Sequence, residues 1–382
     1  MILTDEQHSY QEAARRFSRE RLLPSYRQRE IDGRLDRALV REIGSLGLIG
    51  VDLPPAFGGL GLDGVTAGLI IEELGYGDFN IGSMAVVAAL LSAILARDAL
   101  PEVAQKWVPA IIQGEAIVAL AITEPRGGSD AANMQFKARQ DADRFILNGE
   151  KTSVTFSDTA DAFLVFARTG KPGDGAKGIT AFLVPSDSAG IRTTRFDDVG
   201  GVCLGRGSVF FDDVVVNSSQ CVGSVGKGFT QVMMGFDYSR ALIALQCIGA
   251  AQASLDEAWA YAKDRQAFGR AIGQFQGVSF PLAEAESQIA AVRQLAYHTL
   301  QLRDAGQPHT AEAAMVKWMG PKTAFDTIHQ CLLTFGHYGW TKDLPHQQRM
   351  RDVMGLEIGD GTASVMKLII ARERIGRVAV QY

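Results

Sequence analysis

The chain has 382 residues, of which 47% are hydrophobic and 21% are charged, and its formal net charge is −5. This length exceeds one ordinary domain, so two or three domains with a large apolar core are expected. The acidic balance and the lack of long basic runs argue against nucleic acid or an anionic membrane surface as a partner.

Residues 1–116 are predicted to form an N-terminal helical domain. Thr4-Asp5-Glu6-Gln7 has the form of a capping box, and Pro24 is predicted to end the first helix. No signal or transit pattern is recognised at the start, which predicts a cytoplasmic protein. The apolar run 84–96 is shorter than the roughly 18 residues of a membrane span. Further helices are predicted over 36–46, 65–74, 81–97 and 101–114.

Residues 117–226 are predicted to form a middle, antiparallel β domain. Their short apolar runs lack helical spacing and are separated by Gly, Asp, Asn or Pro. Asn148-Gly149-Glu150-Lys151 is predicted to be a hairpin turn, because Asn-Gly favours such turns. The expected strands cover 117–122, 145–147, 162–167, 179–184 and 209–211.

Residues 227–382 are predicted to form a C-terminal four-helix bundle. Helical spacing begins at Gly228 and recurs over 282–297, 311–335 and Val365 to Val380. Pro281 and Pro321 are predicted to kink or break two of these helices.

The four cysteines are widely spaced and show no metal-binding pattern. Buried, reduced thiols are therefore expected, and neither disulfides nor a metal site is predicted. These residues are Cys203, Cys221, Cys247 and Cys331.

The tetrad Gly359-Asp360-Gly361-Thr362 directly precedes the last predicted helix. Thr362 can cap that helix, and the two glycines allow a sharp bend before it. Asp360 then lies beside a helix N-terminus among apolar residues. It is either a base aimed into a pocket or a turn-forming Asp beside glycine, and the tetrad alone leaves both open.

Three further segments also have two interpretations each. The loop 121–130 offers backbone N–H groups and two hydroxyls to a polar ligand, or is an ordinary β-turn loop. Asp237 and Arg240 are either ligand-binding or a surface pair three residues apart on a helix. Arg265, close to Phe268, either binds a phosphate or stabilises the negative end of a helix dipole.

Taken in this order, the segments resemble the acyl-CoA dehydrogenase family over nearly the whole chain. The motifs are T-E-P-x-x-G-S-D at 123–130, N-G-E-K at 148–151, R-x-x-F-G at 265–269, Arg351-Asp352, and D-G-T at 360–362 with Ala371-Arg372-Glu373 behind it. The stretches 236–240 and 274–286 most resemble the alicyclic, cyclohexanecarboxyl-CoA branch. The resemblance implies an α+β fold with a helical domain, a middle antiparallel β domain and a C-terminal four-helix bundle.

The resemblance also implies FAD, held between the β domain and the bundle. Thr155 would hydrogen-bond the reactive flavin nitrogen, and a neighbouring subunit would reach the diphosphate or adenosine. The implied FAD-binding residues are Leu120, Ile122, Thr123, Gly128, Ser129, Ser153, Val154, Thr155, Arg265, Phe268, Phe275, Gln276, Leu333, Phe335, Gly336, Thr362 and Ser364. The implied substrate-binding residues are Ser129, Asp237, Arg240 and Gly361.

Asp360 falls where most members of this family carry a catalytic glutamate. The resemblance implies that Asp360 removes the α-proton of an acyl-CoA thioester while hydride leaves the β-carbon for flavin. Its backbone N–H would stabilise the thioester oxygen, and burial under substrate should raise the pKa of its carboxyl. Because Asp is one methylene shorter than Glu, its oxygens retreat by roughly 1.5 Å. A cyclic or α-branched acyl group would suit that retreat.

Three other positions depart from the family pattern. Ser153 replaces the tryptophan usual against the flavin, with Phe156 as a possible substitute, and Ala267 and His337 replace a hydroxyl and a glycine. Electrons are expected to pass to an electron-transferring flavoprotein, and the family's shared FAD site implies a homotetramer. The alternatives are an oxidase of the same fold, either acyl-CoA oxidase or nitroalkane oxidase-like, and a non-catalytic acyl-CoA-binding protein.

Overall fold

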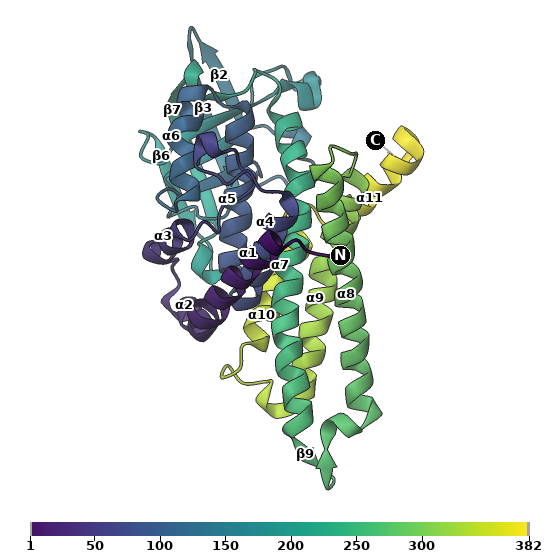
Figure 1. Cartoon of the computed structure of the whole chain (residues 1–382). Helices are drawn as coiled ribbons and strands as arrows, with labels where there is room; N and C mark the ends of the chain where they lie inside the picture. Colours follow the sequence, from purple (N-terminus) through teal and green to yellow (C-terminus); the bar gives the residue numbers. More distant parts are fainter. Residues whose placement is uncertain (1, 380–382) are drawn as a thin grey trace.

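The N-terminal helices pack beside the sheet in the computed structural model, which describes residues 2–379 (Figure 1). The capping box at Thr4 is formed, as predicted. The first helix ends earlier than predicted, at Phe17, and a π-helical turn (Ser18–Leu22) and a 3-10 turn (Leu23–Ser25) lead into the next. The helices are α1 Asp5–Phe17, α2 Tyr26–Asp32, α3 Arg37–Ser45, α4 Gly64–Gly77, α5 Phe79–Asp98 and α6 Pro101–Ile112.

Helix α5 is the one described helix that is long and apolar enough to cross a membrane. Its most apolar window has a mean hydropathy of 2.1, and 78% of that window is buried inside the protein. Burial of this extent is typical of a core helix, whose whole circumference contacts other elements.

The middle domain is a mixed sheet, and it differs from the predicted antiparallel sheet at β4. Most pairs are antiparallel, but β1 and β2 both run parallel to β4, so a purely antiparallel sheet was wrong. Strands β2 and β6 had no apolar run to reveal them, because most of their side chains are exposed or half-buried. The order is β6-β7-β3-β2-β4-β5-β8, with β1 on β4. The strands are β1 Val118–Ala121, β2 Lys137–Asp141, β3 Arg144–Val154, β4 Ala162–Arg168, β5 Ile179–Pro185, β6 Ile191–Arg195, β7 Gly207–Asn217 and β8 Cys221–Val222.

The predicted hairpin turn at 148–151 is wrong. Those residues lie inside β3, where the pairing with β7 shifts register between Leu147 and Gly149. The positive φ of Gly149, +129°, therefore belongs to a β-bulge, which glycine accommodates as readily as a turn. The chain reverses between β2 and β3 at 142–143 instead, where Ala142 has a φ of +56°.

The C-terminal part is built around α9, which packs against the other four helices (Figure 1). Neither Pro281 nor Pro321 breaks its helix: the first lies near the start of α8 and the second inside α9. The last helix ends at Ile375, and Val380 lies outside the described residues. A helix at 346–358 was not anticipated. The elements are α7 Gly228–Asp264, the hairpin β9 Gln266–Ala267 and β10 Arg270–Ala271, α8 Gln276–Asp304, α9 Thr310–Phe335, α10 His346–Ile358 and α11 Ala363–Ile375.

Asp352 on α10 joins all three parts of the chain. Its carboxylate accepts hydrogen bonds from the Tyr26 hydroxyl, from Asn80 Nδ2 (3.0 Å) and from the backbone N–H of Gly201 (2.7 Å). Burial raises the pKa of Asp352 to about 7. This one side chain thus ties the bundle to the N-terminal helices and to the β domain, while the exact domain boundaries near 116 and 226 stay a prediction.

Candidate active site

Asp360 lies in the turn between α10 and α11. The Thr362 hydroxyl accepts a hydrogen bond from the N–H of Val365, so Thr362 caps α11 as predicted. Asp360 has a φ of +53°, in the left-handed region that costs most L-residues about 1–2 kcal/mol and that Asp tolerates better than most. Gly361 has a φ of +99°, and a Cβ there would lie 2.5 Å from Met366 Cε. The turn therefore favours glycine at 361 and holds residue 360 in a left-handed conformation that Asp adopts at low cost.

The Asp360 carboxylate is half-buried and unpaired. Among the described residues, no hydrogen bond or ion pair engages it. Burial within the protein already raises the pKa of Asp360, while the positive charges of Lys317 and Arg240 oppose that rise; the further rise expected under bound substrate stays a prediction. A carboxylate that is partly desolvated and has no fixed partner is available to accept a proton.

Lys317 on α9 supports this turn and was missed in the sequence. Its side chain is fully buried, and its Nζ donates to the carbonyl oxygens of Leu356 (2.8 Å), Gly359 (2.5 Å) and Gly361. The available signal was a single lysine within the apolar run Ala313 to Met319, where a buried charge needs partners.

Asp237 and Arg240 form an interior pair on α7, so the interpretation as a surface pair is wrong. Arg240 Nη1 lies 2.9 Å from Asp237 Oδ1, and the two side chains are 5% and 18% exposed. Thr310 Oγ1 donates to the other Asp237 oxygen at 2.6 Å. The positive charge of Arg240 acts to lower the pKa of Asp360, and the Arg240 Nε is buried without a hydrogen-bond partner in the part of the chain that the structure describes. The pair therefore belongs to α7 of the bundle, and the charge of Arg240 acts on the catalytic candidate from that helix.

The loop that follows β1 is pinned to β3 by a buried ion pair. Lys151 Nζ lies 2.9 Å from both Glu124 Oε1 and the Ile122 carbonyl oxygen, and the Lys151 side chain is fully buried. Glu124 also accepts the backbone N–H groups of Gln135 and Phe136. The T-E-P and N-G-E-K motifs therefore meet through Glu124 and Lys151, a contact that sequence spacing did not reveal.

The residues expected to line a flavin come together along this loop and the end of β3. The backbone N–H of Thr152 donates to the Thr123 carbonyl at 2.9 Å. The space in front of the loop is open, because a Cβ on Gly127 would meet no atom within 4 Å. Val154 is buried, so only its backbone could reach a ligand. The half-buried or exposed members are Leu120, Ile122, Thr123, Gly128, Ser129, Ser153 and Thr155.

This open shelf fits FAD by its donor set, since hydroxyls and backbone groups match the polar edge of an isoalloxazine ring. Ser153 has a φ of +57°, and its hydroxyl accepts a hydrogen bond from Arg206 Nη1 at 2.9 Å. Phe156 is only 1% exposed. Its ring therefore cannot replace the missing tryptophan, and a Ser–Arg pair stands at that position instead.

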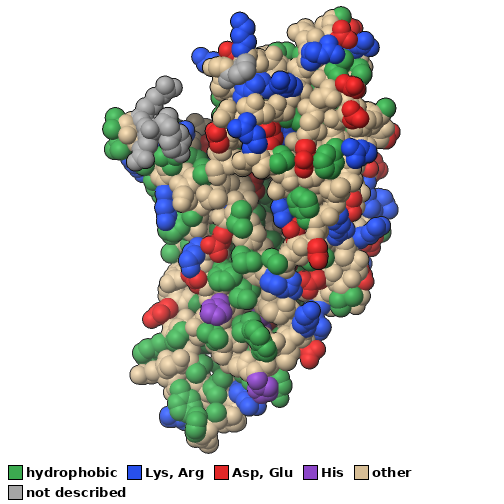
Figure 2. Space-filling view, turned by 180° about the vertical axis from the view of Figure 1, so that it is seen from behind, with side chains coloured by type: hydrophobic (Ala, Val, Ile, Leu, Met, Phe, Trp, Pro, Cys, Tyr) green, Lys and Arg blue, Asp and Glu red, His purple; other side chains and the backbone are tan. Residues whose placement is uncertain are grey.

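Two further predicted FAD residues, Thr362 and Ser364, lie at the start of α11, and the other seven lie at the opposite end of the molecule from the shelf. Figure 1 places the β9–β10 hairpin at the lower end and the sheet at the upper end. One chain therefore does not bring the two groups together. Exposed apolar side chains gather at this lower end in Figure 2, and we call them the bundle tip: Phe268, Phe280, Leu333, Tyr338 and Trp340. The predicted residues there are Arg265, Phe268, Phe275, Gln276, Leu333, Phe335 and Gly336.

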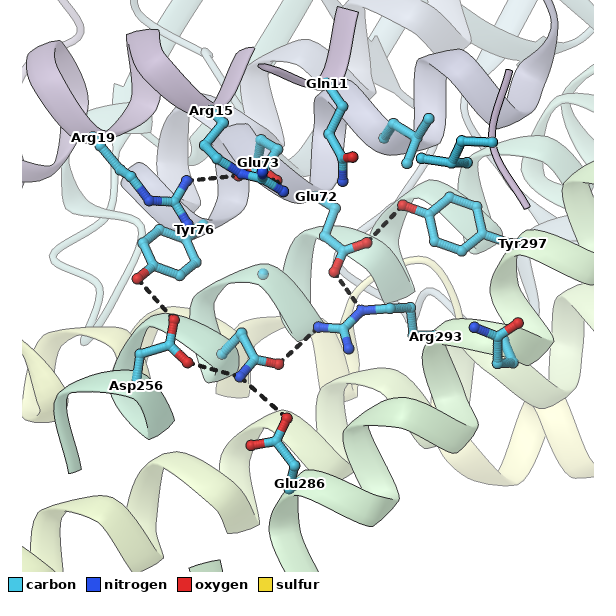
Figure 3. Close-up of a pocket in the computed structure, with 15 residues that line it drawn as sticks. Gln11, Arg15, Arg19, Glu72, Glu73, Tyr76, Asp256, Glu286, Arg293 and Tyr297 are labelled. Atoms are coloured by element: carbon cyan, nitrogen blue, oxygen red, sulfur yellow. Dashed lines mark hydrogen bonds and ion pairs between the residues drawn. The ribbon is translucent and has the colours of Figure 1, made fainter. Parts of the chain in front are cut away.

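A separate cavity of about 430 Å³ lies between α1, α4, α7 and α8 (Figure 3). Its charged groups point at one another: Glu72 accepts from Arg293 Nε and from the Tyr297 hydroxyl, each at 2.6 Å. Tyr76 donates to Asp256 at 3.0 Å. The cavity contains none of the predicted site residues, and its paired charges describe a structural network that joins the N-terminal helices to the bundle.

Comparison with known proteins matches all three parts of the chain to one family. Residues 4–115, 119–214 and 226–375 match the N-terminal, middle and C-terminal domains of acyl-CoA dehydrogenases. The probable acyl-CoA dehydrogenase YngJ of Bacillus subtilis is 33% identical over 373 residues, which is 97% of this chain and 98% of that protein.

Solved structures agree with this match. Butyryl-CoA dehydrogenase from Megasphaera elsdenii is 30% identical, with a TM-score of 0.94 and coverage of 98% of this chain and 99% of that one. A chain in a structure of the electron transferring flavoprotein of Acidaminococcus fermentans is 32% identical, with a TM-score of 0.95 and coverage of 98% and 99%. Glutaryl-CoA dehydrogenase from Mycobacterium smegmatis, in complex with FADH2, is 25% identical, with a TM-score of 0.93 and coverage of 99% and 97%. The chain therefore belongs to the acyl-CoA dehydrogenase family, whose members act on acyl-CoA with a flavin cofactor.

Proposed function

We propose that this acyl-CoA dehydrogenase introduces an α,β double bond into a cyclic or α-branched acyl-CoA, such as cyclohexanecarboxyl-CoA, with Asp360 as the base. The observation that carries the proposal is a half-buried carboxylate that has no partner within residues 2–379 and is held in a left-handed turn. An aspartate at this position, in place of the family's usual glutamate, supports the narrower choice of acyl group.

In the proposed reaction Asp360 accepts the α-proton, and bound FAD supplies the acceptor for the β-hydride. Lys317 and Arg240 favour the ionised carboxylate before reaction, whereas burial raises the pKa of Asp360. A base is most effective when its pKa approaches the working pH, so these opposing influences suit proton abstraction. The backbone N–H of Asp360 would donate to the thioester oxygen as negative charge develops there.

The aspartate positions its oxygens roughly 1.5 Å farther back than a glutamate would. An α-carbon inside a ring, or one that carries a branch, is bulkier on the side of the base and would fill that space. The test is a scan of cyclohexanecarboxyl-, cyclohexenecarboxyl-, isobutyryl- and butyryl-CoA with an artificial electron acceptor. A preference for butyryl-CoA would refute the proposed acyl group and leave the dehydrogenase activity in place.

We also propose an electron-transferring flavoprotein as the physiological acceptor, supported by the solved relative from Acidaminococcus fermentans. The competing candidate is an oxidase of the same fold. Oxygen consumption distinguishes them: rapid peroxide formation without an added acceptor would favour the oxidase. A colourless protein that binds acyl-CoA without turnover would instead indicate a non-catalytic binding protein.

A homo-oligomer, of the tetramer kind usual in this family, is proposed from the bundle tip. Phe268 is 95% exposed and Trp340 is 85% exposed, although both are large apolar side chains. Burial of such a patch against another copy would remove it from water and would bring Arg265 to the partner's FAD shelf. The mass of the FAD-loaded protein in solution tests this, and a monomer would refute it.

A further inference from the structure

Lys317 has an environment that needs explanation, because a fully buried lysine is expensive unless its ammonium group is satisfied. It belongs to α9, whereas all three of its hydrogen-bond acceptors belong to the end of α10 and the turn that follows. An ammonium group has three protons, and three carbonyl oxygens receive them. The lysine is therefore committed entirely to this one turn.

Two of the three acceptors flank Asp360, the catalytic candidate, in the sequence. Gly359 and Gly361 are the residues immediately before and after Asp360, and Lys317 binds the carbonyl oxygens of both. Two peptide groups fixed to one nitrogen atom restrict the backbone between them. Asp360 occupies that interval with a φ of +53°, a conformation that persists in non-glycine residues only where the surroundings impose it.

The lysine binds the backbone and leaves the carboxylate alone. No ion pair between Lys317 and Asp360 is found among the residues that the structure describes, although each influences the pKa of the other. A direct salt bridge would hold the carboxylate away from substrate and weaken it as a base. Arg240 is similarly engaged by Asp237, at 2.9 Å.

We propose that Lys317 is a positioning residue for catalysis, which clamps the peptide group before Asp360 and the peptide group after Gly361, and so aims the Asp360 carboxylate at the α-carbon. The inference rests on the proposed role of Asp360 as the base. Positioning of this kind affects the rate steeply, because a displacement of about 1 Å can cost about 100-fold.

The clamp should also make the reaction sensitive to alkaline pH. The groups that face Lys317 are Asp360 in the turn, Cys247 and Arg240 on α7, and Glu357 on α10. Burial lowers the pKa of Lys317 to about 8. Above that pH the amine has one proton fewer than its three acceptors require. One of the three hydrogen bonds is then lost, and the rate of flavin reduction should fall.

The test compares the FAD-loaded wild type with Lys317→Met and Lys317→Arg, measuring kcat, KM and their pH profiles with the best acyl-CoA. Lys317→Met removes every donor while keeping the side-chain length. We expect kcat to fall about 100-fold, with KM changed by less than about threefold, because three of the four implied substrate-binding residues, Ser129, Asp237 and Arg240, lie outside the turn. Lys317→Arg keeps a charge that does not titrate, so it should regain part of kcat and lose the alkaline decline.

Lys322→Met is the matched control on the same helix. Lys322 is 52% exposed, and Asp326 is its one ion-pair partner within residues 2–379, so this variant should behave as the wild type. Lys317→Met with wild-type kcat and an unchanged pH profile would overturn the positioning role. Should neither Lys317 variant fold, the wild type decides: a flat kcat between about pH 7 and 9 refutes the clamp. A wild type inactive toward every thioester would instead refute the proposed function.

Discussion

Substitution of Asp360 by Asn is the sharpest test of the proposed reaction. Asn has nearly the same shape and tolerates the left-handed φ of +53°, so the turn should persist. Lys317 should also stay bound, since its three hydrogen-bond acceptors in the described structure are backbone oxygens. What disappears is the proton acceptor.

The magnitude follows from general-base catalysis, which contributes about 100- to 10,000-fold, equal to about 3–5 kcal/mol of transition-state free energy. The free energy of unfolding of Asp360→Asn should not fall together with the catalytic rate. A raised pKa means that folding disfavours the ionised carboxylate, so the neutral Asn should unfold with an equal or larger free energy near neutral pH. The expected outcome is therefore a folded, FAD-containing protein with a severe kinetic defect.

The assay is anaerobic bleaching of the bound flavin by cyclohexanecarboxyl-CoA, followed in single-turnover mode. Asp326→Asn, at an exposed carboxylate on α9, is the matched control and should bleach at the wild-type rate. Bleaching by Asp360→Asn at an undiminished rate would show that another group removes the proton. That result would refute the role of Asp360 even if the family's overall reaction were observed.

Three remaining predictions concern acyl choice, cofactor retention and stability. Asp360→Glu should raise the ratio of the rate with butyryl-CoA to the rate with cyclohexanecarboxyl-CoA, measured with an artificial acceptor. An unchanged ratio would argue that the shorter side chain of Asp360 does not select the acyl group. Lys151→Met leaves the Glu124 carboxylate buried without its charge partner, so it should cost about 3–5 kcal/mol in thermal unfolding and release FAD more readily. The pKa of Asp352 is raised to about 7, so the folded state holds a proton that the unfolded state loses, and the unfolding free energy should fall by up to about 1.4 kcal/mol per pH unit from about pH 4 to 7. Asp352→Asn should abolish that slope in denaturant titrations, and an unchanged slope would mean that another group binds the proton.

The helical parts were predictable because their apolar periodicity is continuous. Thr4 and Thr362 were both identified correctly as caps, since the side-chain chemistry of an N-cap is local. Strands β2 and β6 were missed because most of their side chains are exposed or half-buried, so neither strand has an apolar run. The Asn-Gly rule failed at Gly149 because the same glycine conformation serves a bulge inside a strand.

The candidate site was predictable only where its residues are close in sequence or carry a family motif. Asp360 stands out because it lies between two glycines. Lys317 does not, because its three acceptors are backbone oxygens about 40 residues away along the chain, and backbone atoms leave no signature in a sequence. The contact of Lys151 with Glu124 was hidden for a similar reason, since it depends on how the loop after β1 lies against β3.

The unbroken length of α7 constrains how this chain can change during evolution. Within this helix of 37 residues, Arg240 and the C-cap Arg265 at the bundle tip are 25 positions apart, so at about 1.5 Å per residue they are separated by about 38 Å. Inserting or deleting a single residue between them would rotate one end against the other by about 100°. Insertions and deletions among relatives should therefore occur in the connection at 305–309 and be absent between Arg240 and Arg265. A change of length there would misalign the candidate active site and the bundle tip at the same time.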